Sequence, residues 1–227
     1  MTLPTTADVK QLKHIGRYLI GKPRVAMMFK DQVQNAGATM VTVLGDTDYA
    51  GCPVSRRSTN GGIVFDGCNP LHAWSTTQAT VAMSSGEAEL YGCVKASAEG
   101  LGVASGYGDL GEPRRLGVGL DSSAALGIVR RVGLGKLKHI DTKYLWVQHA
   151  RKQGRLGVFK VDGNKNGANL MTKYMDKQTL ETDMANCGLV VLTGRNSQAL
   201  RREIDTATMS KTWVLLVLAF CQMAGAR

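Results

Sequence analysis

Apolar residues recur along the chain at two spacings, every third or fourth residue and every second residue, and these spacings predict its secondary structure. Residues 8–20 form a helical pattern with apolar side chains on one face, and Gly21 and Pro23 follow it. Runs of β-branched and other apolar residues predict strands at 40–48, 61–65, 71–75, 116–120 and 156–161. Further helices are expected at 84–106, 122–131, 141–153 and 166–174.

The order of these elements indicates the α/β class. Turn residues at 66–70 separate two short strands, which predicts a hairpin. The later strands alternate with helices, as they do where parallel strands are joined by helical crossovers. We therefore expect a mixed sheet covered by helices. Beyond residue 187 the pattern assigns no element.

Composition narrows the class of protein. The 227 residues are 44% hydrophobic and 20% charged, which is typical of a globular protein and excludes a largely disordered chain. The five cysteines are odd in number and no pair has CxxC spacing. A disulfide framework or zinc ribbon is therefore not expected, and an intracellular protein, cytoplasmic or nuclear, fits better. The N-terminal sequence also lacks the apolar run of a signal peptide.

One apolar run stands near the C-terminus, at 213–221, with the sequence WVLLVLAFC. It is shorter than the ~20 residues that a membrane-spanning helix needs. A docked helix or an interfacial segment is the favoured interpretation, and a tail anchor is the less favoured one. We therefore expect no membrane partner.

The net charge of +10 is unevenly distributed. Residues 41–112 contain eight acidic and three basic residues, whereas residues 113–160 contain two acidic and eleven basic ones. Clustered carboxylates repel one another unless a cation neutralises them, and a basic segment favours an anionic partner such as nucleic acid. Solvated charges on separate faces are the alternative.

Three acids occupy positions where chemistry is expected. Asp46 lies within the first sheet strand, Glu89 in the first turns of the long helix, and Asp121 at the end of the 116–120 strand. Oxygen ligands of this kind favour Mg²⁺ or Mn²⁺ over zinc. Surface or capping acids are the alternative, since Asp121 also suits a helix N-cap. Asp48 shares a strand face with Asp46, so the pattern alone does not choose between them.

Five blocks of sequence, in order, resemble the RNase H domain of copia-type LTR retrotransposon polyproteins. They are LGDTDYAGCPVSRRSTNGGIVF (44–65), WSTTQATVAMSSGEAELYG (74–92), LGVGLDSSAALGI (116–128), LKHIDTKYLWVQ (137–148) and ANLMTKYM (168–175). The segment LKHIGRYLIGKP (12–23) is similar to the connection from the reverse transcriptase. The resemblance implies an RNase H-like mixed five-stranded sheet with helices on both faces. It divides the chain into a connection remnant (1–40), the RNase H-like domain (41–176) and a C-terminal extension of uncertain structure (177–227).

The resemblance also implies roles for particular residues. Asp46, Glu89 and Asp121 match three acids of the RNase H metal site, and the first acid of the Asp-x-Asp pair is the catalytic one, which favours Asp46. The fourth acid position is occupied by Asn169. An Asn carbonyl oxygen can ligate a hard cation but brings no negative charge, so one of two Mg²⁺ or Mn²⁺ positions should bind more weakly. Asp162 is a candidate to compensate.

The implied function is hydrolysis of the RNA strand of RNA/DNA hybrids by two-metal catalysis, attenuated by Asn169. The alternative is a nucleic-acid-binding module with a decayed metal site, or a retroelement relic. The expected partners are an RNA/DNA hybrid or other nucleic acid, and a reverse transcriptase domain. A basic cluster is the expected hybrid contact, with a solubilising surface as the alternative, and it consists of Arg130, Arg131, Lys136, Lys138 and Lys143.

Overall fold

The computed structural model describes residues 5–30, 40–135 and 138–194, which fall into two compact units. Within these residues the smaller unit contains helix α1 (Thr6–Gly21), which confirms the helix expected at 8–20. The helix begins with a capping box in which Thr5 and Asp8 each bind the other's backbone N–H. The apolar run at 213–221 lies outside the described residues. No helix within the described ranges is long and apolar enough to cross a membrane.

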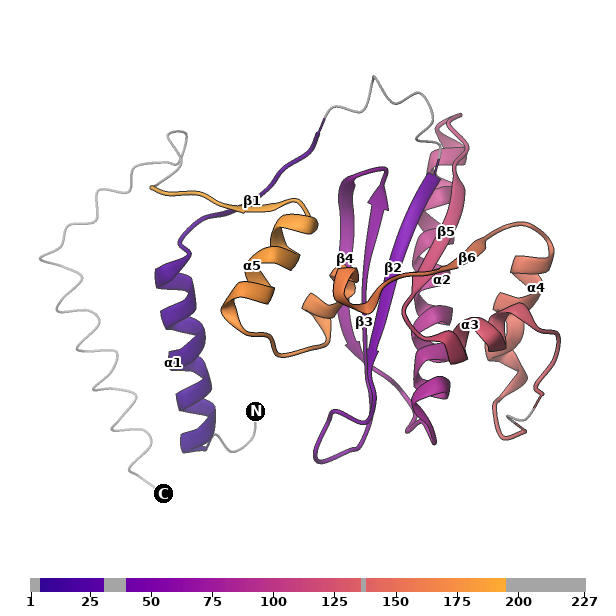
Figure 1. Ribbon diagram of the computed structural model, residues 1–227, viewed down its shortest axis with the longest axis horizontal. Helices are drawn as coiled ribbons and strands as arrows, with labels where there is room; N and C mark the ends of the chain where they lie inside the picture. Colours follow the sequence, from indigo (N-terminus) through magenta and orange to yellow (C-terminus); the bar gives the residue numbers. More distant parts are fainter. Residues whose placement is uncertain (1–4, 31–39, 136–137, 195–227) are drawn as a thin grey trace, which may run out of the picture. The chain divides into compact units, whose positions relative to one another are not determined.

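The larger unit, residues 25–192, contains a five-stranded sheet (Figure 1). Its order is β4-β3-β2-β5-β6, and the strands are β2 (Met40–Asp48), β3 (Thr59–Asp66), β4 (Asn69–Thr77), β5 (Arg115–Leu120) and β6 (Gly157–Lys160). β4, β3 and β2 pair antiparallel, whereas β2, β5 and β6 pair parallel. The mixed five-stranded sheet expected from the sequence is therefore confirmed.

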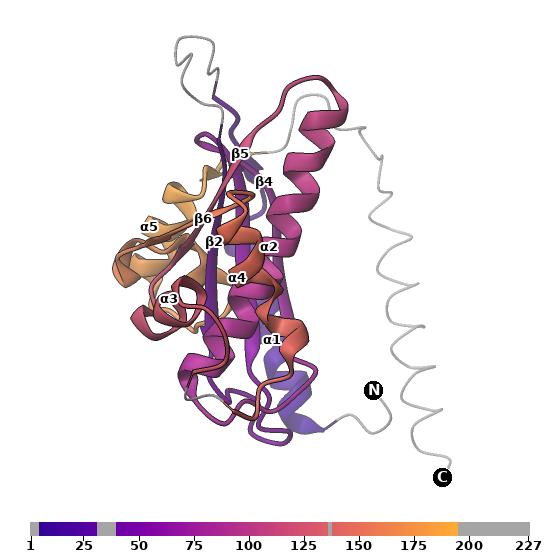
Figure 2. The ribbon, with the colours of Figure 1, turned by 90° about the vertical axis from the view of Figure 1, so that its right-hand side faces the viewer.

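Helices cover both faces of this sheet, as Figure 2 shows with the strands seen nearly edge-on. The face that carries Val41 and Val43 packs against α2 (Ser85–Asp109), and α3 (Ser123–Arg130) and α4 (Trp146–Lys152) complete that core. The opposite face packs against the 3₁₀ helix η3 (Gly167–Met171), with α5 (Lys177–Asn186) beyond it. Alternation along β2 separates the two faces, because successive side chains point to opposite sides of a strand.

Helix α2 starts where the sequence predicts and packs closely on the sheet. Ser84 is its N-cap and accepts a hydrogen bond from the Glu87 N–H. Gly92 faces β2 so closely that an added Cβ would lie 2.3 Å from Thr47 Oγ1. A side chain at this position would force Thr47 or the helix to shift, so glycine allows the close approach that brings the first turns of α2 beside β2.

Two predicted helices differ in the structure. The segment expected to be one helix at 166–174 instead contains the short 3₁₀ helix η3, which follows a 3₁₀ turn, η2 (Gly163–Lys165). The cause is Asn166, whose side chain donates to the Gly45 carbonyl of β2 and accepts from the Ala168 N–H. The helix expected at 141–153 begins with a 3₁₀ turn, η1 (Thr142–Leu145), before α4.

The compact unit extends past the expected 41–176 domain at both ends. β1 (Val25–Met27) pairs antiparallel with β7 (Leu189–Val191) in a separate two-stranded sheet. Helix α5 falls at the start of the extension 177–227, whose structure the sequence left uncertain, and Asp176 caps it by accepting from two backbone N–H groups.

Candidate metal centre

Strand register brings Asp46 and Asp121 together. β2 and β5 are neighbouring parallel strands in which Gly45 pairs with Leu120. Asp46 and Asp121 each follow one member of this pair, so they lie side by side where β5 ends. The carboxyl ends of parallel strands are the usual place for sites in α/β sheets.

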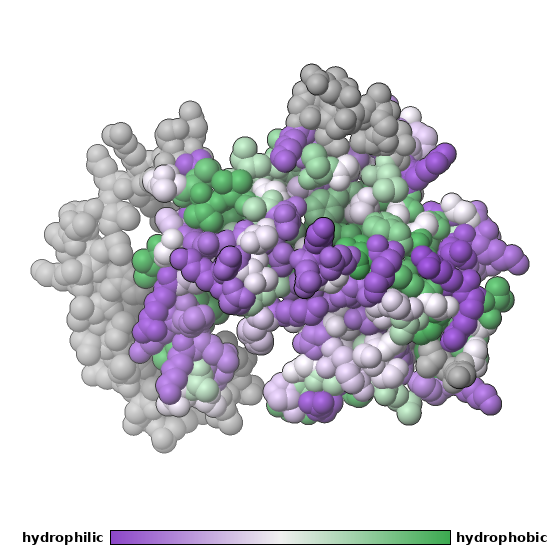
Figure 3. All heavy atoms as spheres, in the orientation of Figure 1, coloured by the Kyte–Doolittle hydropathy of each residue, from purple (hydrophilic) through white to green (hydrophobic). Residues whose placement is uncertain are grey.

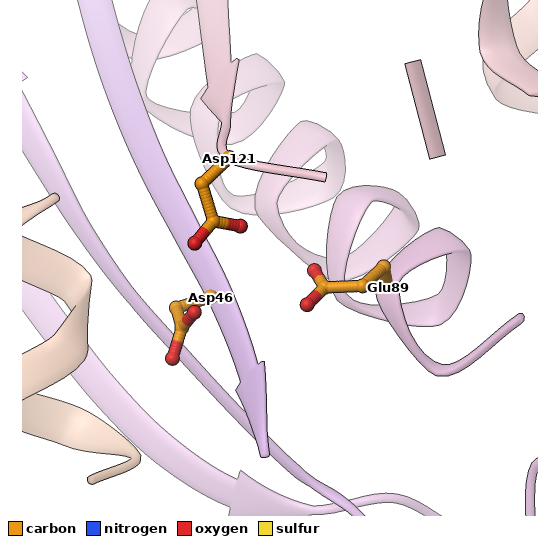
Figure 4. Close-up of side chains that lie close together, drawn as sticks. All are labelled: Asp46, Glu89 and Asp121. Atoms are coloured by element: carbon orange, nitrogen blue, oxygen red, sulfur yellow. The ribbon is translucent and has the colours of Figure 1, made fainter. Parts of the chain in front are cut away.

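Glu89 approaches the same point from α2, five residues after the N-cap Ser84. Figure 4 shows the carboxylates of Asp46, Glu89 and Asp121 directed toward a common centre. One oxygen of each lies within 4.8 Å of those of the other two. Asp48 is not part of this cluster, because β2 continues past the end of its pairing with β5.

The cluster carries unfavourable electrostatics in the absence of a cation. Burial, followed by the charges of Asp121 and Asp46, raises the pKa of Glu89 to about 8. Burial and the charge of Asp46 also raise the pKa of Asp121. Three close carboxylates, of which Glu89 and Asp121 have raised pKa values, fit a divalent cation, which would remove the repulsion. All the donors are oxygens, which suits Mg²⁺ or Mn²⁺.

Asp46 is the most buried of the three acids, at 1% exposure, and both of its oxygens have partners. The Thr172 hydroxyl donates to Oδ2, and the Lys173 ammonium lies 3.0 Å from Oδ1. Both partners follow η3 directly in the chain. The segment after η3 therefore supplies a hydroxyl and a positive charge to the edge of the acidic cluster.

Asn169 reaches the cluster through Lys173. Its side-chain oxygen accepts a 2.6 Å hydrogen bond from Lys173 Nζ, and its side-chain nitrogen donates to the Gly163 carbonyl at 2.7 Å. Asn169 is 8% exposed. The Asn169 oxygen thus faces the same ammonium that contacts Asp46.

Two basic residues at the site, Lys173 and Lys160, were not singled out from the sequence. Lys160 donates to the Asp121 carbonyl and to Ser123 Oγ. Lys173 is the Lys of the last block of the resemblance (168–175), and its place in that block was the available signal. Asp162, the expected compensating acid, caps η2 through the Asn164 N–H and is outside the three-acid cluster.

The basic residues expected to contact nucleic acid lie on several elements. Arg130 ends α3, and Arg131 donates to the Leu134 carbonyl. Lys138 and Lys143 are exposed, with Lys143 Nζ 3.0 Å from Asp141. Lys136 lies outside the described residues. On the face drawn in Figure 3, hydrophilic side chains are interspersed with hydrophobic ones.

A second polar network ties the loop before η1 to the start of α2. The His139 ring nitrogen Nε2 lies 2.8 Å from the Glu87 carboxylate, which also accepts from the Tyr91 hydroxyl and the Met83 N–H. Burial opposes ionisation of Glu87, but these hydrogen bonds outweigh it and lower its pKa. The network fixes the loop that carries Lys138.

Strand order, helices on both faces and acids from β2, α2 and β5 together define an RNase H-like domain with an acidic cluster. No protein-family model matches the chain. Its sequence is similar to retrovirus-related Pol polyproteins from two Arabidopsis thaliana transposons. It is 28% identical to that of RE1 over 192 residues and 26% identical to that of RE2 over 197 residues. These matches cover 83% and 84% of this chain, but the chain spans only 13% of each polyprotein.

Two solved structures of RNase H domains are similar to part of this chain. LC11-RNase H1, isolated from compost, is 16% identical, and the match covers 64% of this chain and 99% of that one with a TM-score of 0.47. The N-terminal RNase H domain of a Mycobacterium tuberculosis protein is 19% identical, with 65% and 97% covered and a TM-score of 0.42. The sequence similarity to a segment of retrovirus-related Pol polyproteins from plant transposons confirms the resemblance seen in the sequence.

Proposed function

We propose that the chain is an RNase H-type endonuclease domain that hydrolyses the RNA strand of RNA/DNA hybrids with the help of divalent cations. The observation that carries the proposal is the convergence of Asp46, Glu89 and Asp121 from three different elements. Their oxygen-only donor set and the raised pKa of Glu89 support a site for Mg²⁺ or Mn²⁺. The similarity to Pol polyproteins supports the reaction class.

Each acid has a defined part in the proposal. Asp46, held by Thr172 and Lys173, would present its carboxylate toward the centre that the three acids share. Glu89 and Asp121 would close the site from the helix side and from the end of β5. Divalent ions bound here would lower the pKa of an attacking water and stabilise the departing 3′-oxygen. Asn169, uncharged, would leave one metal position weaker, so we expect attenuated hydrolysis.

The proposed substrate follows from the basic residues and from the homology. Exposed Lys138 and Lys143, together with Arg130, would contact phosphates, and such contacts carry little sequence information. Selectivity for RNA would come from 2′-hydroxyl contacts and from the shape of the hybrid. A reverse transcriptase domain is the proposed neighbour, since this chain corresponds to a small part of the polyproteins that it matches.

The test is cleavage of an RNA/DNA hybrid labelled on the RNA strand, with Mg²⁺ or Mn²⁺ and with EDTA as the metal-free reference. We expect metal-dependent cleavage that Asp46→Asn lowers by at least about 100-fold. The matched control is Asp48→Asn, which makes the same change on the same strand outside the cluster. Equal cleavage by the wild type and Asp46→Asn would contradict the proposed site.

A second candidate function is hybrid binding without hydrolysis. The contact of Lys173 with both Asp46 and Asn169 favours it, because an ammonium already neutralises part of the cluster. Metal-independent hybrid binding, with no cleavage in Mn²⁺, would select this second function. Hybrid binding that is insensitive to salt would argue against both functions.

A further inference from the structure

Glu87 is a buried carboxylate that takes no part in the three-acid cluster. It lies in the first turn of α2, two residues before Glu89, and its side chain is only 4% exposed. Its Oε2 accepts from the Met83 N–H at 2.9 Å, and its Oε1 accepts from the Tyr91 hydroxyl at 2.6 Å. These two hydrogen bonds hold the carboxylate from the side of α2. A third partner, His139, comes from a turn far along the chain.

His139 attaches the turn before η1 to this carboxylate. Its Nε2 lies 2.8 Å from Glu87 Oε2, and because a carboxylate only accepts hydrogen bonds, the ring nitrogen is the donor. The His139 side chain is 40% exposed, so its removal does not open a cavity in the core. The next residue, Ile140, is 4% exposed and packs in the main core. The turn should therefore stay folded when the His139 hydrogen bond is lost.

The residue most dependent on this hydrogen bond is Lys138, which directly precedes His139 and is exposed. Lys143 has a support of its own, because its Nζ lies 3.0 Å from Asp141 Oδ2 and 5.1 Å from the centre of the Tyr144 ring. The two lysines are thus supported separately, and His139 supports Lys138. A backbone that is already fixed loses less conformational entropy when its side chain binds a phosphate.

We propose that His139 is a positioning residue for hybrid binding. Through its hydrogen bond to Glu87 it fixes the backbone of Lys138 beside the first turns of α2, where the lysine contacts a phosphate of the nucleic acid. The inference rests on the proposed function in that it takes an RNA/DNA hybrid as the ligand. It goes further by giving a role to His139 and Glu87. Because α2 also carries Glu89, a phosphate bound at Lys138 would lie beside the helix that supplies one acid of the metal centre.

The test is a double-mutant cycle in hybrid binding, measured by fluorescence anisotropy on the full chain in EDTA, where metal-dependent cleavage does not occur. Lys138→Gln should weaken binding by roughly three- to tenfold and lower the salt slope by about 0.9. His139→Ala should weaken binding by roughly two- to tenfold, through the lost ordering of Lys138, and by no more than Lys138→Gln does. The double variant should bind as Lys138→Gln does, because His139 acts through Lys138.

Two further variants complete the cycle. His139→Gln keeps an N–H donor near the place of Nε2 and should restore most of the affinity that His139→Ala loses. His149→Ala, an exposed change on α4, is the matched control and should bind as the wild type does. Urea unfolding of His139→Ala checks that the fold is retained.

Losses that add in the double variant would overturn the proposal, because His139 would then act independently of Lys138. Unchanged binding by His139→Ala, or no hybrid binding by the wild type, would also overturn it. Cleavage is a separate readout. If the wild type binds but does not cut the hybrid while the cycle is non-additive, the proposed hydrolysis fails and the inference stands. If the wild type cuts the hybrid and His139→Ala leaves both KM and kcat unchanged, the inference fails and the proposed function stands.

Discussion

Replacing Glu89 by Gln should stabilise the metal-free protein at alkaline pH, because it removes one carboxylate from the cluster. The folded chain raises the pKa of Glu89 to about 8 through burial and the charges of Asp121 and Asp46, against 4.5 for an unperturbed glutamate. Between these two values the folded state holds one proton more than the unfolded state. The free energy of unfolding therefore falls as pH rises, and it levels off above pH 8.

The magnitude follows from the two pKa values. Each pH unit in the interval costs about 1.4 kcal/mol, so the full interval sets an upper limit of about 5 kcal/mol. We expect Glu89→Gln to be more stable than the wild type by about 2–5 kcal/mol at pH 8.5 in EDTA. At pH 4.5 and below, where Glu89 is protonated in both states, the two proteins should differ little.

The assay is equilibrium urea unfolding in EDTA at several pH values from 4.5 to 9. Glu112→Gln, an exposed change in the turn after α2, is the matched control and should follow the wild type throughout. Saturating Mg²⁺ should restore stability to the wild type and much less to Glu89→Gln. Parallel stability curves for the wild type and Glu89→Gln across the whole pH range would refute the electrostatic reasoning.

Three further outcomes are expected. Mg²⁺ binding at pH 7 should release about one proton from the wild type and almost none from Glu89→Gln, measured by calorimetry in buffers of different ionisation enthalpy. Gly92→Ala should lower the free energy of unfolding by about 1–3 kcal/mol, because its Cβ would lie 2.3 Å from Thr47 Oγ1. Its control in the same urea unfolding assay is Gly102→Ala, where an added Cβ meets nothing within 4 Å, and this change should be neutral or stabilising. Lys138→Gln should reduce the salt dependence of hybrid binding by about one phosphate contact, a slope change of about 0.9, in fluorescence anisotropy titrations.

The sheet was predictable because its strands are short apolar runs separated by clear turn residues. The β-branched residues of β2 and the turn between β3 and β4 identify the antiparallel part, and the alternation with helices identifies the parallel part. The 166–174 segment was not predictable in the same way. The Asn166 side chain donates a hydrogen bond to the backbone of β2. Such a tertiary contact overrides the local preference for an α-helix.

The sequence pattern alone could not decide whether Asp46 or Asp48 belongs to the acidic cluster. Both acids alternate to the same face of β2, so periodicity treats them alike. Parallel register with β5 separates them, because only Asp46 lies beside the residue that follows Leu120. The family resemblance favoured Asp46 without this geometry, and the register supplies the physical reason.

The structure also changes the interpretation of Asn169, which replaces an acid of the family pattern. From the sequence alone, Asn169 indicates the loss of a charge and a weaker metal position. In the structure its amide nitrogen donates to the Gly163 carbonyl, where a carboxylate oxygen would meet a carbonyl oxygen at hydrogen-bond distance. Its oxygen accepts from Lys173, which also contacts Asp46. Asn169 therefore forms a hydrogen bond through both its amide nitrogen and its amide oxygen, and the substitution is accommodated by the Gly163 carbonyl and by Lys173.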